Sequence, residues 1–194
     1  MNAIRILGIV GSQRRNSSNR MALRAAQELV PAGVVIELIE LHGIPFFEPR
    51  REQRPPGAVV EFRQRVRAAD AILFATPECN HAVPGGLKSA IDWAARPVED
   101  CAWAGKPAAV MTATTGSLTT LRAQHHLRQM LASMQMPTVD HPAFMRGIAA
   151  SRFGTDGSVN DEATRQFIQQ LVLALVTLVR VNWVNQRHGT KASA

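Results

Sequence analysis

The sequence predicts an α/β domain in which a parallel β-sheet lies between two layers of helices. Short apolar runs alternate along the chain with longer segments whose apolar residues recur every three or four positions. The short runs are apolar throughout, which is typical of strands buried on both faces of a parallel sheet. The chain of 194 residues is long enough for one domain with a substantial core. Regular alternation of strand and helix favours three layers over a bundle or a sandwich.

The first two elements show how each assignment is made. Ile4–Val10 is a continuous apolar run that ends at Gly11, so we expect a buried strand. Asn19–Val30 places its apolar residues on one helical face and stops at Pro31 and Gly33. The same reasoning predicts further strands at Val34–Leu41, Ala71–Ala75, Lys106–Thr112 and Pro137–Val139, and helices at Ala58–Ala69, Leu87–Ala94, Leu118–Met134 and Asp161–Gln186.

Five strands joined by crossover helices suit the flavodoxin-like arrangement, with strand order 2-1-3-4-5. We expect one domain over residues 1–188 and a disordered tail over residues 189–194. Ligands of such sheets bind at the carboxyl ends of the strands, near the point where the strand order reverses. The candidate site is therefore formed by the loops after the first, third and fourth strands, which are Gly11–Asn19, Pro77–Gly86 and Thr112–Thr120.

The net charge of +7 comes mostly from arginine, since only three of the 22 basic residues are lysine. The densest patches are Arg50, Arg51 and Arg54, and then Arg63, Arg65 and Arg67. No aromatic residues lie between these arginines, as a platform for single-stranded nucleic acid would require, and no helix-turn-helix or RNA-binding motif is present. We interpret the patches as a solvated surface and expect no nucleic-acid partner.

Cysteine content and apolar segments indicate the compartment. Two cysteines cannot form a disulfide framework or a four-cysteine zinc site. The N-terminal residues lack the pattern of a secretory signal, and the longest apolar stretch, Leu171–Val179, is far shorter than the ~20 residues of a membrane span. We expect a cytoplasmic protein without a membrane partner, and no metal ligand set is evident.

The loop Gly11–Asn19 has the composition of a phosphate site. It joins a buried strand to the N-terminus of a helix, where free N–H groups and the helix dipole favour an anion. Ser12, Ser17 and Asn19 add side-chain donors, and Arg14 adds a fixed positive charge. The Walker pattern and the Gly-x-Gly-x-x-Gly pattern are both missing. The alternative is a polar loop in which Ser17 or Ser18 only caps the helix.

The other two loops could present backbone groups to a planar ring. Pro77 and Pro84 fix the backbone on either side of Glu78, Cys79 and Asn80, so this loop is stiff. Thr114, Thr115 and Gly116 offer small hydroxyls and a close backbone approach. Ordinary turns, with Glu78 solvated and His81 exposed, are the alternative interpretation. His81, His125 and His126 could touch a substrate, although surface positions are the simpler expectation.

Together these loops resemble the NAD(P)H-dependent FMN reductase family, which includes flavodoxin-like quinone, azo-dye and chromate reductases. Gly11–Asn19 matches the family's phosphate loop, roughly G-S-x-R-x-x-S-x-N, at every fixed position. Residues 77–93 match the ring loop and its following helix, roughly P-E-Y-N-x-x-x-P-G-x-L-K-N-A-I-D-W, with Cys79 in place of Tyr and Ser89 in place of Asn. The stretch Arg122–Gln129 is also similar, and the resemblance covers about residues 4–180.

The resemblance implies FMN as cofactor and NADPH or NADH as hydride donor. It implies that the phosphate of FMN binds Ser12, Arg14, Ser17 and Asn19. The ring system then lies against Pro77, Glu78, Cys79 and Asn80 on one side and against Thr114, Thr115 and Gly116 on the other. The family also implies a homodimer or homotetramer, and Phe167–Val181 with Trp183 and Trp93 gives independent support for an interface.

The expected activity is an FMN-dependent transfer of hydride from NAD(P)H to a small acceptor (a quinone, an azo compound, chromate or free flavin) by a ping-pong mechanism. No side chain is expected to act as a catalytic acid or base. Cys79 could be a space-filler, a redox-sensitive thiol or a partner of Cys101. One alternative is an FMN-binding electron carrier without a nicotinamide site, and another is a basic protein associated with nucleic acid.

Overall fold

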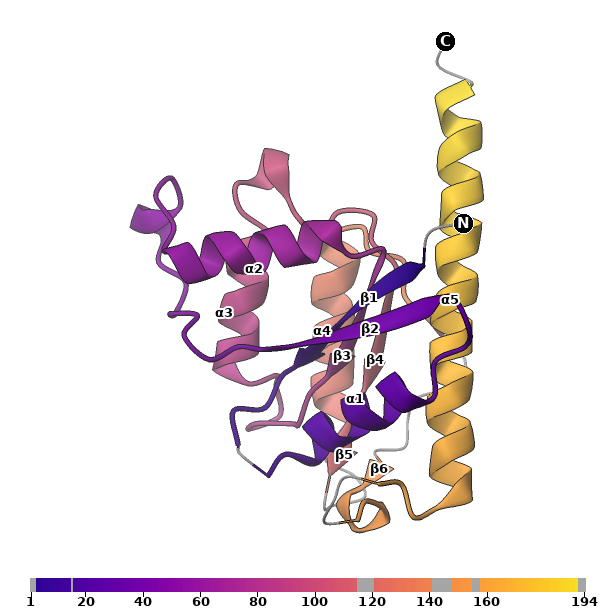
Figure 1. The fold of residues 1–194 in the computed structure, drawn as a ribbon. Helices are drawn as coiled ribbons and strands as arrows, with labels where there is room; N and C mark the ends of the chain where they lie inside the picture. The colour runs from indigo at the N-terminus through magenta and orange to yellow at the C-terminus, as the bar shows by residue number, and fades with distance from the viewer. Residues whose placement is uncertain (1–2, 15, 115–120, 141–147, 155–157, 192–194) are drawn as a thin grey trace.

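The computed structural model describes residues 3–14, 16–114, 121–140, 148–154 and 158–191. A parallel sheet of four strands has the order β2-β1-β3-β4, with β1 at Ile4–Val10, β2 at Val34–Glu40, β3 at Ala71–Ala75 and β4 at Ala108–Met111. Helices lie on both faces of this sheet (Figure 1). They are α1 (Ser18–Glu28), α2 (Gly57–Ala68), α3 (Gly85–Ala94), α4 (Leu121–Ser133) and α5 (Glu162–Lys191).

Alternate residues of each central strand enter two separate cores. In β3, Ala71, Leu73 and Ala75 belong to the core shared with α1 and α5, whereas Ile72 and Phe74 belong to the core shared with α2, α3 and α4. Side chains of a strand point to opposite faces with a period of two, so both sets are apolar only where both faces are covered. The all-apolar composition of β3 thus follows from its central place, and the three-layer prediction is confirmed.

The fifth predicted strand is not formed as a strand in the described residues. Thr138 makes one parallel bridge to Ala108, with hydrogen bonds from Ala108 N–H to the Pro137 carbonyl (2.8 Å) and from Val139 N–H to the Ala108 carbonyl (2.9 Å). A second parallel pair joins β5 (Ala113–Thr114) to β6 (Ile148–Ala149). Pro137 has no N–H to offer a ladder, which limits pairing at this edge. The order 2-1-3-4 agrees with the flavodoxin-like prediction apart from this edge.

The last helix is longer than the sequence pattern predicts. We expect an end at Gln186 and a disordered tail from Gly189, but α5 continues to Lys191. Asp161 begins this helix, since its Oδ2 accepts hydrogen bonds from Thr164 N–H (2.8 Å) and Thr164 Oγ1 (2.6 Å). Hydrogen bonds from Thr164, and then the positive charge of and hydrogen bond from Arg152, hold the pKa of Asp161 below its usual value.

By length and composition, Glu162–Asn185 is the one helical segment among the described residues that could cross a membrane. Its apolar face, however, packs into the core beside α1, with Ile168, Leu171, Val172 and Leu175 almost fully buried. The final turns of α5 extend beyond the rest of the described chain (Figure 1). The apolar composition of α5 is thus explained at least in part by its role in the core.

Candidate functional site

The loops after β1 and β3 touch at the carboxyl edge of the sheet. Gly11 donates its N–H to the Ala75 carbonyl at 2.8 Å. A Cβ on Gly11 would lie 2.7 Å from Thr76 Oγ1, and one on Gly86 would lie 2.8 Å from Gln13 Nε2. Gly11 has no room for a side chain beside Thr76, and Gly86 lies against the flexible end of Gln13, so the first loop lies directly against the segment after β3 and the start of α3. The predicted site loops are therefore neighbours in space.

Hydroxyl groups in the first loop are held by backbone donors. Ser12 Oγ accepts from Arg14 N–H at 3.3 Å, and Ser17 Oγ accepts from Arg20 N–H at 3.4 Å as the N-cap of α1. Both serines are buried. Because a hydroxyl can accept and donate together, each keeps its O–H for another acceptor. Ser17 is a helix cap, as the alternative interpretation expects, and this leaves its donor available to an anion.

Asn19 links the first loop to the third. Its Nδ2 donates to the Ala113 carbonyl at 2.9 Å, and its Oδ1 accepts from Ala113 N–H at 2.8 Å. The side chain is 3% exposed, so both hydrogen bonds are shielded from water. Asn19 thus fixes the start of α1 against the end of the fourth strand. The sequence predicts a direct phosphate contact for Asn19, and the structure gives it a second task, which is to position the loop.

A tight turn forms the tip of the second loop. Cys79 N–H donates to the Ala82 carbonyl at 2.8 Å, and Ala82 N–H donates to the Cys79 carbonyl at 3.1 Å. Asn80 and His81, between them, have φ values of +49° and +65°. Two residues with positive φ are the signature of a type I′ turn, in which the second position favours glycine. Cys79 is exposed, and both it and Cys101 are free thiols, so the alternative in which the two cysteines pair is not formed in this structure.

Glu78 ties this turn to the beginning of α4. Its Oε2 accepts from Ala123 N–H at 3.2 Å, and its side chain is 6% exposed. The alternative interpretation, in which Glu78 is solvated, is therefore wrong. Its Oε1 lies 3.4 Å from His81 Nδ1, and the Arg122 guanidinium approaches the same ring, with Nη1 2.6 Å from Nδ1. Glu78, His81 and Arg122 form one cluster at the rim of the candidate site.

The third loop is described only at its beginning. Thr112 is buried, and its Oγ1 accepts from Gln124 Nε2 at 2.7 Å, which joins the end of β4 to α4. Thr114 pairs with Ala149 in the short β5–β6 ladder. The predicted residues Thr115 and Gly116 lie outside the described residues. Thr114 thus stands at the carboxyl edge near Asn19, where the sequence places it.

Helix α3 is braced by the loop after β2. Ser89 Oγ accepts from Phe47 N–H at 2.6 Å, and Trp93 Nε1 donates to the Pro45 carbonyl at 2.9 Å. Trp93 is 2% exposed and packs edge-on against Phe47. It therefore belongs to the interior of this chain, and the use of Trp93 as evidence for a subunit interface is wrong. Lys88 and Asp92, one turn apart on α3, form an ion pair at 2.7 Å.

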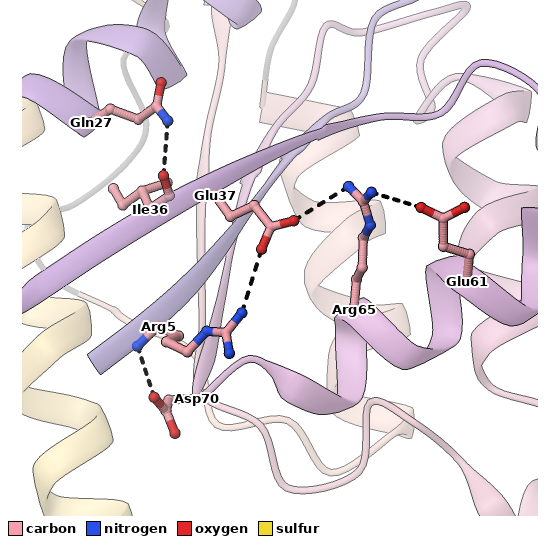
Figure 2. A network of polar contacts seen from close by, with 7 residues as sticks. All are labelled: Arg5, Gln27, Ile36, Glu37, Glu61, Arg65 and Asp70. Carbon is pink, nitrogen blue, oxygen red and sulfur yellow. Dashed lines mark hydrogen bonds and ion pairs between the residues drawn. The ribbon is translucent and has the colours of Figure 1, made fainter. Parts of the chain in front are cut away.

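The arginine patch of α2 is paired with carboxylates. Arg63 and Arg67 both bind Asp100 Oδ2, at 3.0 Å and 2.7 Å. Arg65 lies between Glu61 (2.7 Å) and Glu37 (3.3 Å), and Arg5 reaches the same Glu37 at 3.7 Å (Figure 2). A guanidinium engaged in this way offers less to nucleic-acid phosphates. The patch lies on α2 and at the start of the sheet, away from the carboxyl edge.

Several supporting residues escape analysis of the sequence. Gln13, Thr76 and Gln124 contact the site loops, and Arg122 meets His81 across some 40 positions of sequence. The glycines at 11 and 86 are the only local signals of such close approach. The sequence gives no signal for the Asn19–Ala113 or Glu78–Ala123 bonds, because each joins loops that only the fold brings together.

Fold and site together define a flavodoxin-like protein whose carboxyl-edge loops can hold a phosphate and a planar ring. Residues 4–151 match the NADPH-dependent FMN reductase family. The chain is 46% identical over 178 residues to an NAD(P)H-dependent FMN reductase of Pseudomonas aeruginosa, covering 91% of this chain and 96% of the relative. It is 40% identical over 175 residues to a quinone reductase of Pseudomonas putida, covering 90% and 94%.

A solved structure agrees with these relatives. The flavoenzyme NAD(P)H:(acceptor) oxidoreductase of Paracoccus denitrificans is 31% identical and superposes with a TM-score of 0.85, covering 93% of this chain and 99% of that one. The chain therefore belongs to the NADPH-dependent FMN reductase family. It is an oxidoreductase that uses FMN and NAD(P)H, and the predicted resemblance is confirmed.

Proposed function

We propose that this enzyme transfers reducing equivalents from NAD(P)H through FMN to a quinone. The family supplies FMN and the nicotinamide donor. A quinone as acceptor is supported by the quinone reductase of Pseudomonas putida, which is 40% identical to this chain over 175 residues. The observation that carries the proposal in this chain is the joining of three carboxyl-edge loops by Asn19 and Glu78. A cytoplasmic location accords with two free cysteines.

The first loop suits the phosphate of FMN. Residues 11–19 contain no acidic side chain. Ser12 and Ser17 each keep a hydroxyl hydrogen, and Arg14 is exposed with no carboxylate partner among the described residues. A set of donors with net positive charge and no competing carboxylate fits a phosphate dianion. We assign Ser12, Arg14 and Ser17 to the phosphate, with Asn19 holding the loop in place.

The second and third loops suit the ring system. The turn at Cys79–Ala82 is closed by two backbone hydrogen bonds, and Glu78 anchors it to α4. A loop that is already ordered loses little entropy when a ring binds against it. We assign Pro77, Glu78, Cys79 and Asn80 to one side of the ring, with Glu78 acting through the loop, and Thr114, Thr115 and Gly116 to the other.

In this mechanism the protein chiefly positions the reactants and supplies electrostatic stabilisation. FMN supplies the redox chemistry, because it can take a hydride from a nicotinamide and pass two electrons to an acceptor. Donor and acceptor occupy one site in turn, which is a ping-pong order. The rigid turn at residues 79–82 would orient whichever molecule is present, and loop N–H groups with nearby positive charge would favour negative charge at the ring site. No side chain needs to act as a catalytic acid or base.

Stopped-flow absorbance tests the proposal directly. The purified protein should be yellow and should release FMN on heating. Mixing it with excess NADPH without oxygen should bleach the flavin absorbance, and a later addition of benzoquinone should restore it. Absorbance that stays oxidised under excess NADPH and NADH would overturn the proposal. Steady turnover without a partner protein separates this enzyme from a simple electron carrier.

We also propose that the enzyme is a homodimer or homotetramer. Support comes from α5, on which Leu173, Val181 and Val184 are exposed at 44%, 50% and 52%. Exposed apolar residues gathered on one helix are typical of a contact with another protein surface. Light scattering after size-exclusion chromatography measures the mass. A mass near the 21.2 kDa of one chain at micromolar concentration would contradict this part of the proposal.

A further inference from the structure

Two arginines at the carboxyl edge of the sheet differ from those of α2. Arg14 and Arg122 are exposed, and neither lies within ion-pair distance of a carboxylate in the part of the chain that the structure describes. The reaction brings two phosphate-bearing molecules to this edge, which are FMN and the nicotinamide dinucleotide. Arg14 lies in the loop that suits FMN. We propose that Arg122, together with His81, binds a phosphate group of the dinucleotide donor.

Arg122 is held in place without being neutralised. Its Nη1 lies 2.6 Å from His81 Nδ1 and 3.3 Å from Nε2. Nη1 is thus close to both ring nitrogens, and an imidazole carries no negative charge that could neutralise the guanidinium. The imidazole fixes the direction of Arg122 and leaves its positive charge and its other N–H groups for an anion. A carboxylate in the place of His81 would have cancelled that charge.

The surroundings of the pair favour an anionic ligand. Helix α4 carries Arg122, His125, His126 and Arg128 and has no acidic residue in Leu121–Ser133. Arg128 is committed to Asp140 at 3.1 Å, whereas Arg122 and His125 are exposed one turn apart. Glu78, whose Oε1 lies 3.4 Å from His81 Nδ1, is largely buried, and its Oε2 accepts from Ala123 N–H. The exposed side of the cluster is therefore positive.

The pair is also joined to the loop that faces the ring. His81 is in the Cys79–Ala82 turn, and Glu78 fastens the same segment to α4. A dinucleotide whose nicotinamide lies over the ring passes this rim with its phosphates. The inference rests on the proposed function, because it takes Pro77–Asn80 as the side of the ring site. Two phosphates share this chemistry, namely the pyrophosphate of both donors and the 2′-phosphate found only in NADPH.

The test compares R122A with R180A, which removes the same charge from an exposed position on α5. Titration of NADP⁺ and NAD⁺ into the FMN-loaded protein, followed by isothermal calorimetry, gives dissociation constants without turnover. R122A should raise the constant about tenfold or more, as expected when a charge-assisted hydrogen bond is lost. A rise for NADP⁺ alone assigns Arg122 to the 2′-phosphate, and an equal rise for both assigns it to the pyrophosphate. Unchanged constants for both nucleotides would overturn the inference.

The H81G variant separates a loss of nucleotide affinity from a loss of folding. Glycine is favoured at this position of a type I′ turn, so the variant should melt at an equal or higher temperature than the parent. Its dissociation constant for NADP⁺ should nevertheless rise several-fold. A higher melting temperature with unchanged affinity would count against His81. Should the unmodified protein bind FMN but fail to oxidise either nucleotide, the proposed function would fail instead.

Discussion

Arginines on α2 and arginines at the carboxyl edge carry the same charge in different settings. Arg63, Arg65 and Arg67 all contact carboxylates of this chain. Arg14 and Arg122 contact none in the described part of the chain. The first group is satisfied by the fold, and the second is left for a ligand. The net charge of +7 therefore does not separate the two groups of arginines, whereas the neighbours of each arginine do.

Replacing Asn19 should have the largest effect, because its side chain joins the first and third loops of the candidate site. N19A removes two buried hydrogen bonds and leaves the Ala113 N–H without its acceptor. We expect unfolding to become easier by about 2–3 kcal/mol, with weaker FMN binding. Urea titration with and without FMN measures both. An unfolding free energy of N19A equal to that of the parent protein would contradict this assignment.

Removal of Arg14 tests whether an arginine of the carboxyl edge binds the cofactor. R14A should raise the dissociation constant for FMN by roughly 10- to 100-fold, as expected for a lost charge-assisted bond to phosphate. The free energy of unfolding without FMN should hardly change, since Arg14 is exposed. Fluorescence titration of the apoprotein with FMN and with riboflavin measures this. Riboflavin has no phosphate, so an equal loss for both ligands would show that Arg14 does not bind it.

The opposite result is expected on α2. D100N weakens the contacts to both Arg63 and Arg67. Asp100 is largely exposed, so the loss of stability should be at most about 1 kcal/mol. FMN affinity and turnover should be unchanged. A fall in FMN affinity as large as that of R14A would break the distinction between the two groups of arginines.

The smallest effect is expected at Asp161, whose contribution to the stability of the fold depends on pH. Bonds from Thr164 hold the pKa of Asp161 below its ordinary value of 3.8. Stability from Asp161 is therefore present at pH above that ordinary value and is lost as the pH falls through the lowered value. D161N should lower the melting temperature slightly at pH 7 and make no difference near pH 2. A constant difference across this range would exclude the carboxylate as its cause.

Most of the fold follows from local pattern. Ile4–Val10 and Ala71–Ala75 are predicted with the bounds that the structure shows, because continuous apolar runs have few alternatives in a covered sheet. The strand at the β4 edge of the sheet is harder to predict, since the pairing of Pro137–Val139 depends on what lies beside β4. The end of α5 is also missed, because Gly189 is a stop signal that this helix overrides.

The sequence by itself determined the layers and the family, because each depends on residues that are close along the chain. The motifs at residues 11–19 and 77–93 carry the resemblance to the family, and that resemblance implies FMN. Only the tertiary structure decided the partners of each polar group. It made Asn19 a link to Ala113, Glu78 an anchor for α4 and His81 a partner of Arg122. Such contacts join distant segments, and their geometry depends on the packing of the whole sheet.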